Sequence, residues 1–155
     1  RTVTGVQTCA LPIYVPGIVG MATAGSIALA EREQEMLRIG ALRDRFEQGL
    51  LQTNGINMNS RGVTRIPTIS SVTFGETPAE TLLLELADVA CSKGSACSTS
   101  KPKPSAVIMA MGRSEAQANA TLRFSFGRNT TDEEIDRLIH LVTSAVERVS
   151  ANHQS

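Results

Sequence analysis

A long run of apolar residues at helical spacing begins near Pro16 and continues to Leu50. These residues recur every three or four positions, which is the spacing of one face of an α-helix, and Pro16 suits a first turn. They are Ile18, Met21, Ala22, Leu29, Met36, Ile39, Leu42, Phe46 and Leu50. The pattern predicts one long helix with a single apolar stripe, which ends before Asn54-Gly55. Burial of the whole stripe within this chain is one interpretation, and contact of its first part with structure outside this chain is the alternative.

The segment that follows is predicted to form a strand, a helix and another strand. Residues 66–74 are rich in Ile, Val, Thr and Ser, which favours a strand. Thr77-Pro-Ala-Glu80 has the pattern of a capping box, in which a hydroxyl and a carboxylate satisfy free amides at the start of a helix. Leu82, Leu83 and Leu86 supply the apolar face of that helix. A short strand is expected to run through Val89.

The C-terminal third predicts a short helix, a strand and a long helix. The short helix covers residues 105–111 and is ended by Gly112. Residues 121–126 alternate, so that Leu122, Phe124 and Phe126 face one side while Thr121, Arg123 and Ser125 face the other. A second capping box, Thr131-Asp-Glu-Glu134, starts the last helix, and residues 150–155 are expected to fray. Together the elements predict an α+β fold with a small, mostly antiparallel sheet packed with helices.

Composition narrows the functional classes. The 155 residues carry 15 basic and 15 acidic side chains, so no net charge attracts nucleic acid or an anionic membrane. Hydrophobic residues make up 41%, which suits one globular domain, and the 3% of aromatic residues leave few rings for stacking on bases. The three cysteines, Cys9, Cys91 and Cys97, are too few and too uneven for a disulfide framework. We therefore expect a cytoplasmic protein that binds neither nucleic acid nor membrane.

The first 14 residues differ in character from the rest. Residues 3–13 have no helical or strand periodicity, and they resemble the conceptual translation of a common sequencing adapter. We therefore expect residues 1–14 to be a non-native segment, residues 15–149 to be the domain, and Cys9 to have no function.

The remaining sequence excludes several enzyme classes. It contains no P-loop, no dinucleotide-binding glycine motif, no nucleophile elbow and no cysteine and histidine spacing that suits zinc. His140 lies between Ile139 and Leu141 in the last helix, where we expect a packing or surface residue rather than a catalytic base.

Cys97 is the candidate nucleophile. It lies in Cys91-Ser-Lys-Gly-Ser-Ala-Cys97-Ser-Thr-Ser-Lys-Pro-Lys-Pro104, whose small residues and prolines predict an exposed loop. The nearby cations of Lys93, Lys101 and Lys103 favour the thiolate, which is the nucleophilic form, although an exposed cysteine can also be incidental. Cys91 follows two apolar residues and is expected to be a small buried residue.

Arg123 is the second candidate for the site. It lies on the polar face of its predicted strand, where it can clamp a carboxylate with two hydrogen bonds or pair with an acidic neighbour. Sequence spacing leaves both alternatives open.

Five segments of the chain resemble one enzyme family. They are Val15-Pro-Gly-Ile-Val-Gly20, Ser92-Lys-Gly-Ser-Ala-Cys97-Ser, Pro104-Ser-Ala-Val107, Ala110-Met-Gly112 and Leu122-Arg-Phe-Ser-Phe-Gly-Arg-Asn-Thr-Thr-Asp-Glu-Glu-Ile-Asp136. Together, from residue 15 to residue 149, they resemble the C-terminal part of cysteine desulfurases, which are pyridoxal-phosphate enzymes of the class V aminotransferase group. The resemblance implies the small C-terminal domain of a fold-type I transferase and a homodimeric parent.

The resemblance also implies an activity and two residue roles. Cysteine desulfurases convert L-cysteine to L-alanine and supply sulfur for iron–sulfur clusters and tRNA thiolation. By this resemblance Cys97 receives the sulfur as a persulfide and passes it to an acceptor or iron–sulfur scaffold protein. Arg123 matches the arginine that binds the substrate carboxylate, whereas Arg128 lies in the motif without an assigned role.

The chain lacks the lysine that binds the cofactor in this family. Its three lysines all lie between Lys93 and Lys103, and none matches the lysine that carries pyridoxal phosphate. We therefore expect the isolated chain neither to hold the cofactor covalently nor to turn over cysteine. Two alternatives remain open, namely a relative that acts on selenocysteine and a non-catalytic domain that relays persulfide or binds a partner.

Overall fold

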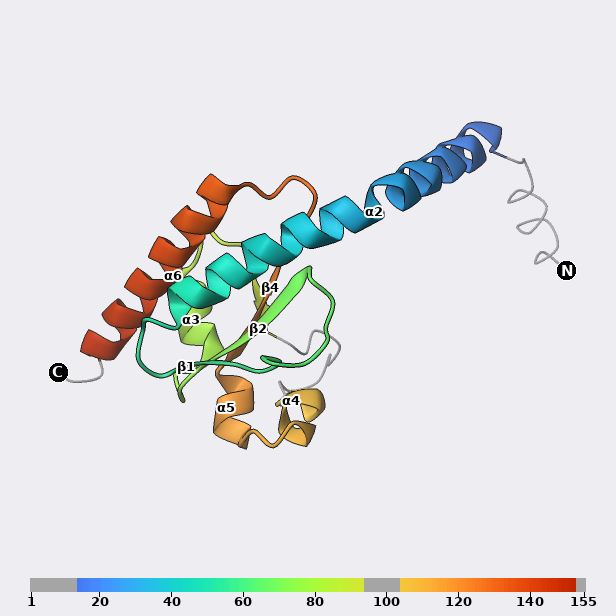
Figure 1. Ribbon diagram of the computed structural model, residues 1–155. Coiled ribbons are helices and arrows are strands. Elements are labelled where there is room, and N and C mark those ends of the chain that lie inside the picture. The colour runs from blue at the N-terminus through green and yellow to red at the C-terminus, as the bar shows by residue number, and fades with distance from the viewer. Residues whose placement is uncertain (1–13, 94–103, 153–155) are drawn as a thin grey trace, which may run out of the picture. The chain divides into compact units, whose positions relative to one another are not determined.

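The computed structural model describes residues 14–93 and 104–152. The chain divides into two compact units, one comprising residues 1–35 and the other residues 36–155. Its helices and strands, in chain order, are α2 (Val15–Leu50), β1 (Ile56–Met58), β2 (Ile69–Phe74), α3 (Ala79–Glu85), β3 (Ser92–Lys93), α4 (Ala106–Ala110), α5 (Glu115–Asn119), β4 (Thr121–Ser125) and α6 (Asp132–Asn152) (Figure 1).

A four-stranded antiparallel sheet forms the centre of the second unit, with the strand order β1-β2-β4-β3. Its side chains alternate between two faces because successive residues of a strand point in opposite directions. Val72 lies opposite Leu122, and Ser71 lies opposite Arg123. One face is therefore apolar and the other polar, and the α+β fold with an antiparallel sheet is confirmed.

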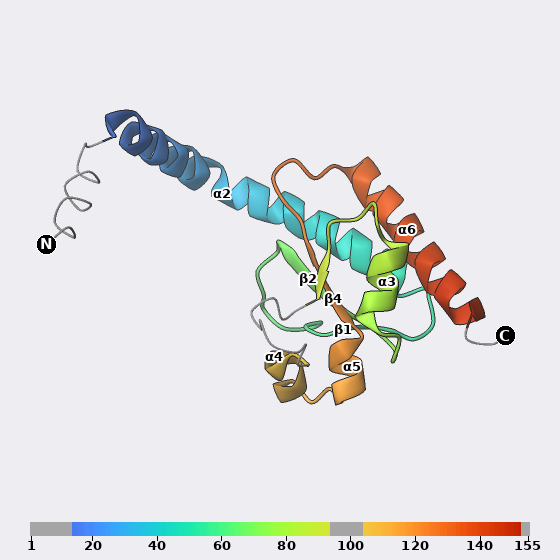
Figure 2. The same cartoon turned by 180° about the vertical axis from the view of Figure 1, so that it is seen from behind.

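Helices α3 and α6 and the later part of α2 cover the apolar face. The core contains Ile39 and Leu42 of α2, Leu82 of α3 and Ile135 of α6. All four phenylalanines of the chain are buried there, and the ring centroids of Phe46 and Phe124 lie 4.9 Å apart. Figure 2 shows α4 and α5 beside each other at the opposite side of the sheet from α2 and α6.

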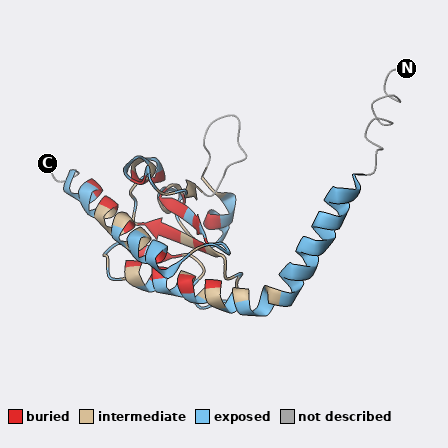
Figure 3. Ribbon diagram, turned by 90° about the horizontal axis from the view of Figure 1, so that it is seen from above, coloured by how far each residue is buried: buried red, intermediate tan, exposed pale blue. Residues whose placement is uncertain are grey.

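The prediction of one buried stripe along α2 is wrong for its first half. In the first unit Ile18, Met21 and Leu29 are exposed, with 54%, 75% and 74% of their surface accessible (Figure 3). The periodicity predicted the helix, but an apolar stripe is buried only where another element covers it. Burial begins at Ile39, where the helix packs in the core.

Several predicted boundaries also change. Strand β2 begins at Ile69 rather than at residue 66, because Pro67 cannot donate a ladder hydrogen bond. The capping box at Thr77 does not form, since Pro78 is the N-cap residue of α3 and no side chain caps it. No strand runs through Val89, and β3 starts at Ser92 instead.

Near the C-terminus the predictions are closer to the structure. The capping box of α6 is confirmed, because Thr131 Oγ1 accepts from Glu134 N at 3.2 Å and Glu134 Oε2 accepts from Thr131 N at 3.0 Å. The short helix α4 and its end at Gly112, where φ is +85°, are also confirmed. Helix α6 continues through Asn152, past the start of the expected tail, and residues 153–155 lie outside the described residues.

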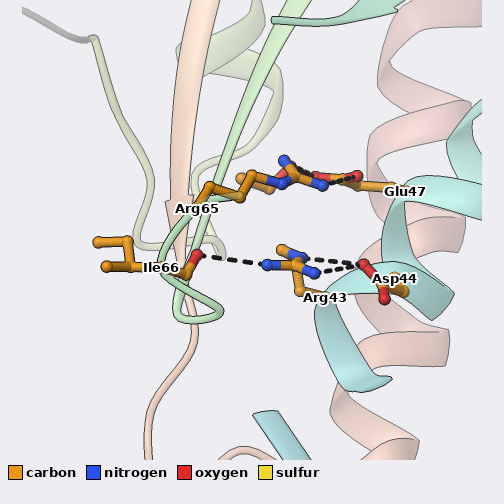
Figure 4. A network of polar contacts seen from close by, with 6 residues as sticks. Arg43, Asp44, Glu47, Arg65 and Ile66 are labelled. Atoms are coloured by element: carbon orange, nitrogen blue, oxygen red, sulfur yellow. Dashed lines mark hydrogen bonds and ion pairs between the residues drawn. The ribbon is translucent and has the colours of Figure 1, made fainter. Parts of the chain in front are cut away.

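A buried ion pair ties α2 to the segment that precedes β2 (Figure 4). Glu47 Oε1 accepts from Arg65 Nη1 at 2.8 Å and from Ser70 Oγ at 2.7 Å, while Glu47 Oε2 accepts from Arg65 Nη2 at 2.6 Å. The carboxylate also raises the pKa of the Arg65 guanidinium above its ordinary value. Both oxygens of this buried carboxylate are therefore hydrogen-bonded.

Candidate functional site

Arg123 lies exposed on the polar face of the sheet, as the alternation predicted. Its backbone is held between two neighbours, because it pairs with Ser71 of β2 on one side and with Ser92 of β3 on the other. Directly opposite residues of antiparallel strands share a face, so two small hydroxyl side chains flank Arg123. In the part of the chain that the structure describes, no carboxylate forms an ion pair with Arg123.

Cys97 lies outside the described residues, and so do Cys9, Lys101 and Lys103. The strand that leads toward Cys97 is described, however, and it ends at Lys93. Because β3 pairs with β4 at Arg123, the last described residues before Cys97 lie next to the candidate carboxylate clamp.

Lys93 faces away from Arg123. It lies opposite Leu122, on the helix-covered side, and its ammonium forms an ion pair with Glu80 of α3. This contact holds the pKa of the Glu80 carboxyl below its ordinary value of 4.5. The residue that was expected to complete a capping box at α3 therefore ties α3 to β3 instead.

Cys91 is half-buried and packs against the hydrophobic core. Removal from water disfavours the thiolate, so burial raises the pKa of the Cys91 thiol above its ordinary value. This agrees with its interpretation as a small packing residue and makes it a poor nucleophile at neutral pH.

The sequence did not predict the polar network that lies beside Arg123. Asn59 Oδ1 accepts from Arg113 Nε and from Thr73 Oγ1, both at 3.0 Å, and Asn59 Nδ2 donates to Ser71 Oγ at 3.1 Å. Thr121, predicted to lie on the polar face, is on that face but is buried, with its Oγ1 2.8 Å from Thr73 Oγ1. These residues come from distant segments, and β1 and α5, which bring them together, were not predicted.

The loop after β4 is fixed by α2. Arg38 Nη1 donates to the Thr130 carbonyl at 2.9 Å, and Arg38 Nη2 donates to the Arg128 carbonyl at 2.7 Å. The main chain of Arg128 is thus held in place by Arg38.

The described residues do not fit the covalent site of pyridoxal phosphate. That site needs a lysine whose amine is free to condense with the cofactor aldehyde. Lys93 is the one lysine in the described part of the chain, and its amine pairs with Glu80 on the helix-covered side. The described part also contains no group of three or more histidine, cysteine or acidic residues that could hold a metal ion.

His140 is exposed on α6, as expected of a surface residue. None of the helices in residues 14–93 and 104–152 is long and apolar enough to cross a membrane.

Several known proteins are similar to this chain. Cysteine desulfurases IscS from Shewanella baltica and Klebsiella pneumoniae are 36% and 39% identical over 145 residues, which are 94% of this chain and 35% of each relative. The one from Anaeromyxobacter dehalogenans is 40% identical over 88% of this chain and 34% of its own length. The chain thus spans about a third of the length of the curated relatives it matches.

Solved structures share the fold. A NifS-like protein from Rickettsia africae has a TM-score of 0.73 at 23% identity and covers 86% of this chain and 35% of its own. Another NifS-like protein has a TM-score of 0.69 at 27% identity and covers 88% of this chain and 34% of its own. The sequence profile of the family described as Aminotransferase class-V matches residues 13–138. The chain therefore belongs to the class V aminotransferase family.

Proposed function

We propose that the chain is the C-terminal part of a cysteine desulfurase, which converts L-cysteine to L-alanine and forms a persulfide on Cys97. One observation supports this most directly. Strand β3, which leads toward Cys97, pairs with β4 at Arg123, and Arg123 is an exposed arginine without a carboxylate partner among the described residues. The similarity to the curated cysteine desulfurases agrees with it.

Arg123 binds the substrate carboxylate in this proposal. A planar guanidinium with several donors matches the two oxygens of a carboxylate. Cys97 follows Lys93 by four residues, and a chain of that length reaches at most about 14 Å. The thiol is therefore tethered within a short distance of the amino acid that Arg123 holds.

The sulfur transfer is balanced without an external oxidant. The Cys97 thiolate attacks the substrate sulfur, a sulfur–sulfur bond forms, and the substrate carbon–sulfur bond breaks. The electron pair of the broken bond goes to the substrate carbon, which takes a proton and becomes the methyl group of alanine. The transferred sulfur is oxidised to the persulfide level while the carbon is reduced, and the persulfide then passes to an acceptor or iron–sulfur scaffold protein.

The family depends on pyridoxal phosphate, which supplies an electron sink when it is bound. Because the described residues contain no free lysine, we place the cofactor lysine in a part of the protein beyond these residues, and we expect the 155-residue chain by itself to be inactive. The complete protein is proposed to be a cytoplasmic homodimer. Residues 1–13 lie outside the described residues, so the adapter-derived origin of residues 1–14 stays a prediction.

The test uses the complete protein encoded at the source locus. Wild type, Cys97→Ser and the control Cys91→Ser are incubated with L-cysteine, and alanine and protein-bound persulfide are measured by mass spectrometry. We expect Cys97→Ser to lose both products while the absorbance of the bound cofactor is unchanged, and Cys91→Ser to retain both. Persulfide on Cys91, or normal turnover by Cys97→Ser, contradicts the proposal.

Sequencing the locus upstream of the Val15 codon tests the architecture. We expect an open reading frame that encodes a cofactor lysine and lacks codons for residues 3–13. A genuine start codon with the written N-terminus contradicts the proposal and favours a persulfide relay. A strong preference of the complete protein for selenocysteine over cysteine contradicts the substrate assignment.

A further inference from the structure

Four polar residues form one row across the polar face of the sheet. Ser71 pairs with Arg123, Arg123 pairs with Ser92, and the Asn59 amide donates to the Ser71 carbonyl at 2.9 Å. The row therefore runs in the order Asn59, Ser71, Arg123, Ser92. Neighbouring strands are about 4.8 Å apart, so Asn59 and Arg123 are separated by about 10 Å.

A second arginine lies over the Asn59 end of this row. Arg113 precedes α5, is half-buried, and donates from Nε to Asn59 Oδ1 at 3.0 Å. The same oxygen accepts from Thr73, and the Asn59 amide nitrogen donates to Ser71, which fixes the orientation of the Asn59 side chain. The contact through Nε leaves both terminal nitrogens of Arg113 available, and neither has a partner in the described part of the chain.

The two arginines share one property. Arg123 is exposed on the polar face, Arg113 contacts Asn59 at the end of the row, and neither pairs with a carboxylate among residues 14–93 and 104–152. Each can bind one carboxylate through two parallel hydrogen bonds.

We propose that Arg113 and Arg123 form a two-arginine site that binds a small molecule with two acidic groups. The proposal rests on the function given above for Arg123 as a carboxylate clamp, and the ligand with two acidic groups is a second ligand besides L-cysteine, which has one carboxylate. Arg113 then recognises a second acidic group of the ligand, about two strand spacings away. Asn59 is the positioning residue, since it holds Arg113 by the Nε edge and turns the terminal nitrogens toward the ligand.

The test measures binding to the 155-residue chain by calorimetry at neutral pH. The probes are suberate, a dicarboxylate long enough to reach both arginines, succinate, which is too short, and butyrate, which has one carboxylate. A second charge-assisted contact predicts that suberate binds at least about tenfold more tightly than succinate or butyrate. Arg113→Ala should reduce the affinity for suberate to that for butyrate, and it should keep the butyrate site at Arg123 with unchanged affinity, which also shows that the variant is folded.

Two further variants make the test specific. Asn59→Ala keeps every charge but releases Arg113, and we expect it to weaken suberate binding severalfold. Arg137→Ala removes the same charge from the exposed face of α6, on the helix-covered side of the sheet, and should change none of the three affinities.

Equal binding of suberate and butyrate by the wild-type chain, or unchanged suberate binding by Arg113→Ala, overturns the two-arginine site. Neither result affects the proposed desulfurase function, which Arg123→Ala tests separately. If Arg123→Ala binds as many butyrate molecules as wild type, and as tightly, the carboxylate clamp at Arg123 is wrong. If Arg123→Ala loses one butyrate site while Arg113→Ala retains suberate binding, only the role of Arg113 is refuted.

Discussion

Removing the carboxylate of Glu47 should destabilise the second unit more than any surface change. The Glu47 and Arg65 side chains are only 8% and 16% exposed, and three hydrogen bonds from Arg65 and Ser70 meet the two carboxylate oxygens. Glu47→Ala leaves the Arg65 guanidinium and the Ser70 hydroxyl without their acceptor at a mostly buried position. Removing one partner of a buried ion pair lowers the free energy of unfolding by about 3–5 kcal/mol. The partial exposure of Arg65 places the expected loss near the lower value, about 3 kcal/mol.

Urea unfolding followed by circular dichroism measures this loss in the 155-residue chain. The midpoint should fall while the slope with urea concentration stays constant. Arg45→Ala is the matched control, because Arg45 pairs with Asp132 and Asp136 while all three side chains are 47% or more exposed. Such surface pairs contribute about 0–1 kcal/mol.

The double variant separates the ion pair from simple loss of packing. Arg65→Ala combined with Glu47→Ala leaves no unpaired guanidinium, so the double variant should lose less stability than the sum of the two single variants. A loss below about 1 kcal/mol for Glu47→Ala, or additive losses in the double variant, would refute the reasoning.

Three other predictions concern single contacts. Lys93 lowers the pKa of Glu80, so the ion pair stabilises the fold at pH values above the ordinary pKa of 4.5, and this stabilisation is lost as the pH falls through the lower folded pKa. The urea midpoints of wild type and Lys93→Met should therefore converge on acidification. A constant difference between the two midpoints contradicts this. Burial raises the pKa of Cys91, so iodoacetamide should alkylate it more slowly than a free cysteine at pH 8, as followed by peptide mass spectrometry. Gly49→Ala would place a methyl group 2.7 Å from Ile139 Cδ1, and overpacking should lower the thermal midpoint by an equivalent of about 1–2 kcal/mol, whereas Gly25→Ala meets no atom within 4 Å and should stabilise its helix.

The sequence predicted best those features that depend on neighbouring residues. The alternation of Leu122, Phe124 and Phe126 placed Arg123 on the opposite face, where the structure has it. The capping box at Thr131 formed because its two partners are three residues apart and need no other element. Cys91, predicted to be buried because it follows two apolar residues, packs against the core but is half-buried.

Features that depend on distant segments were missed or changed. Glu80 had the spacing of a capping residue, but Lys93 of β3 offers it a full positive charge, and an ion pair competes well with a hydrogen bond to a backbone amide. The contact between Arg113 and Asn59 was not predicted, because the two residues are 54 positions apart and Asn59 follows a three-residue strand whose pattern is too weak to predict.

By itself, the sequence determined the helix and strand periodicities, the polar face that carries Arg123, and the loop composition and family resemblance that made Cys97 a candidate. These follow from local spacing and side-chain chemistry, which a linear pattern records. The tertiary structure decided which half of the α2 apolar stripe is buried, where the charges of Glu47 and Glu80 are paired, and that Arg113 lies over the same row as Arg123. Those outcomes depend on strand register and on packing between segments far apart in the chain, and a one-residue change of register would move every side chain to the other face.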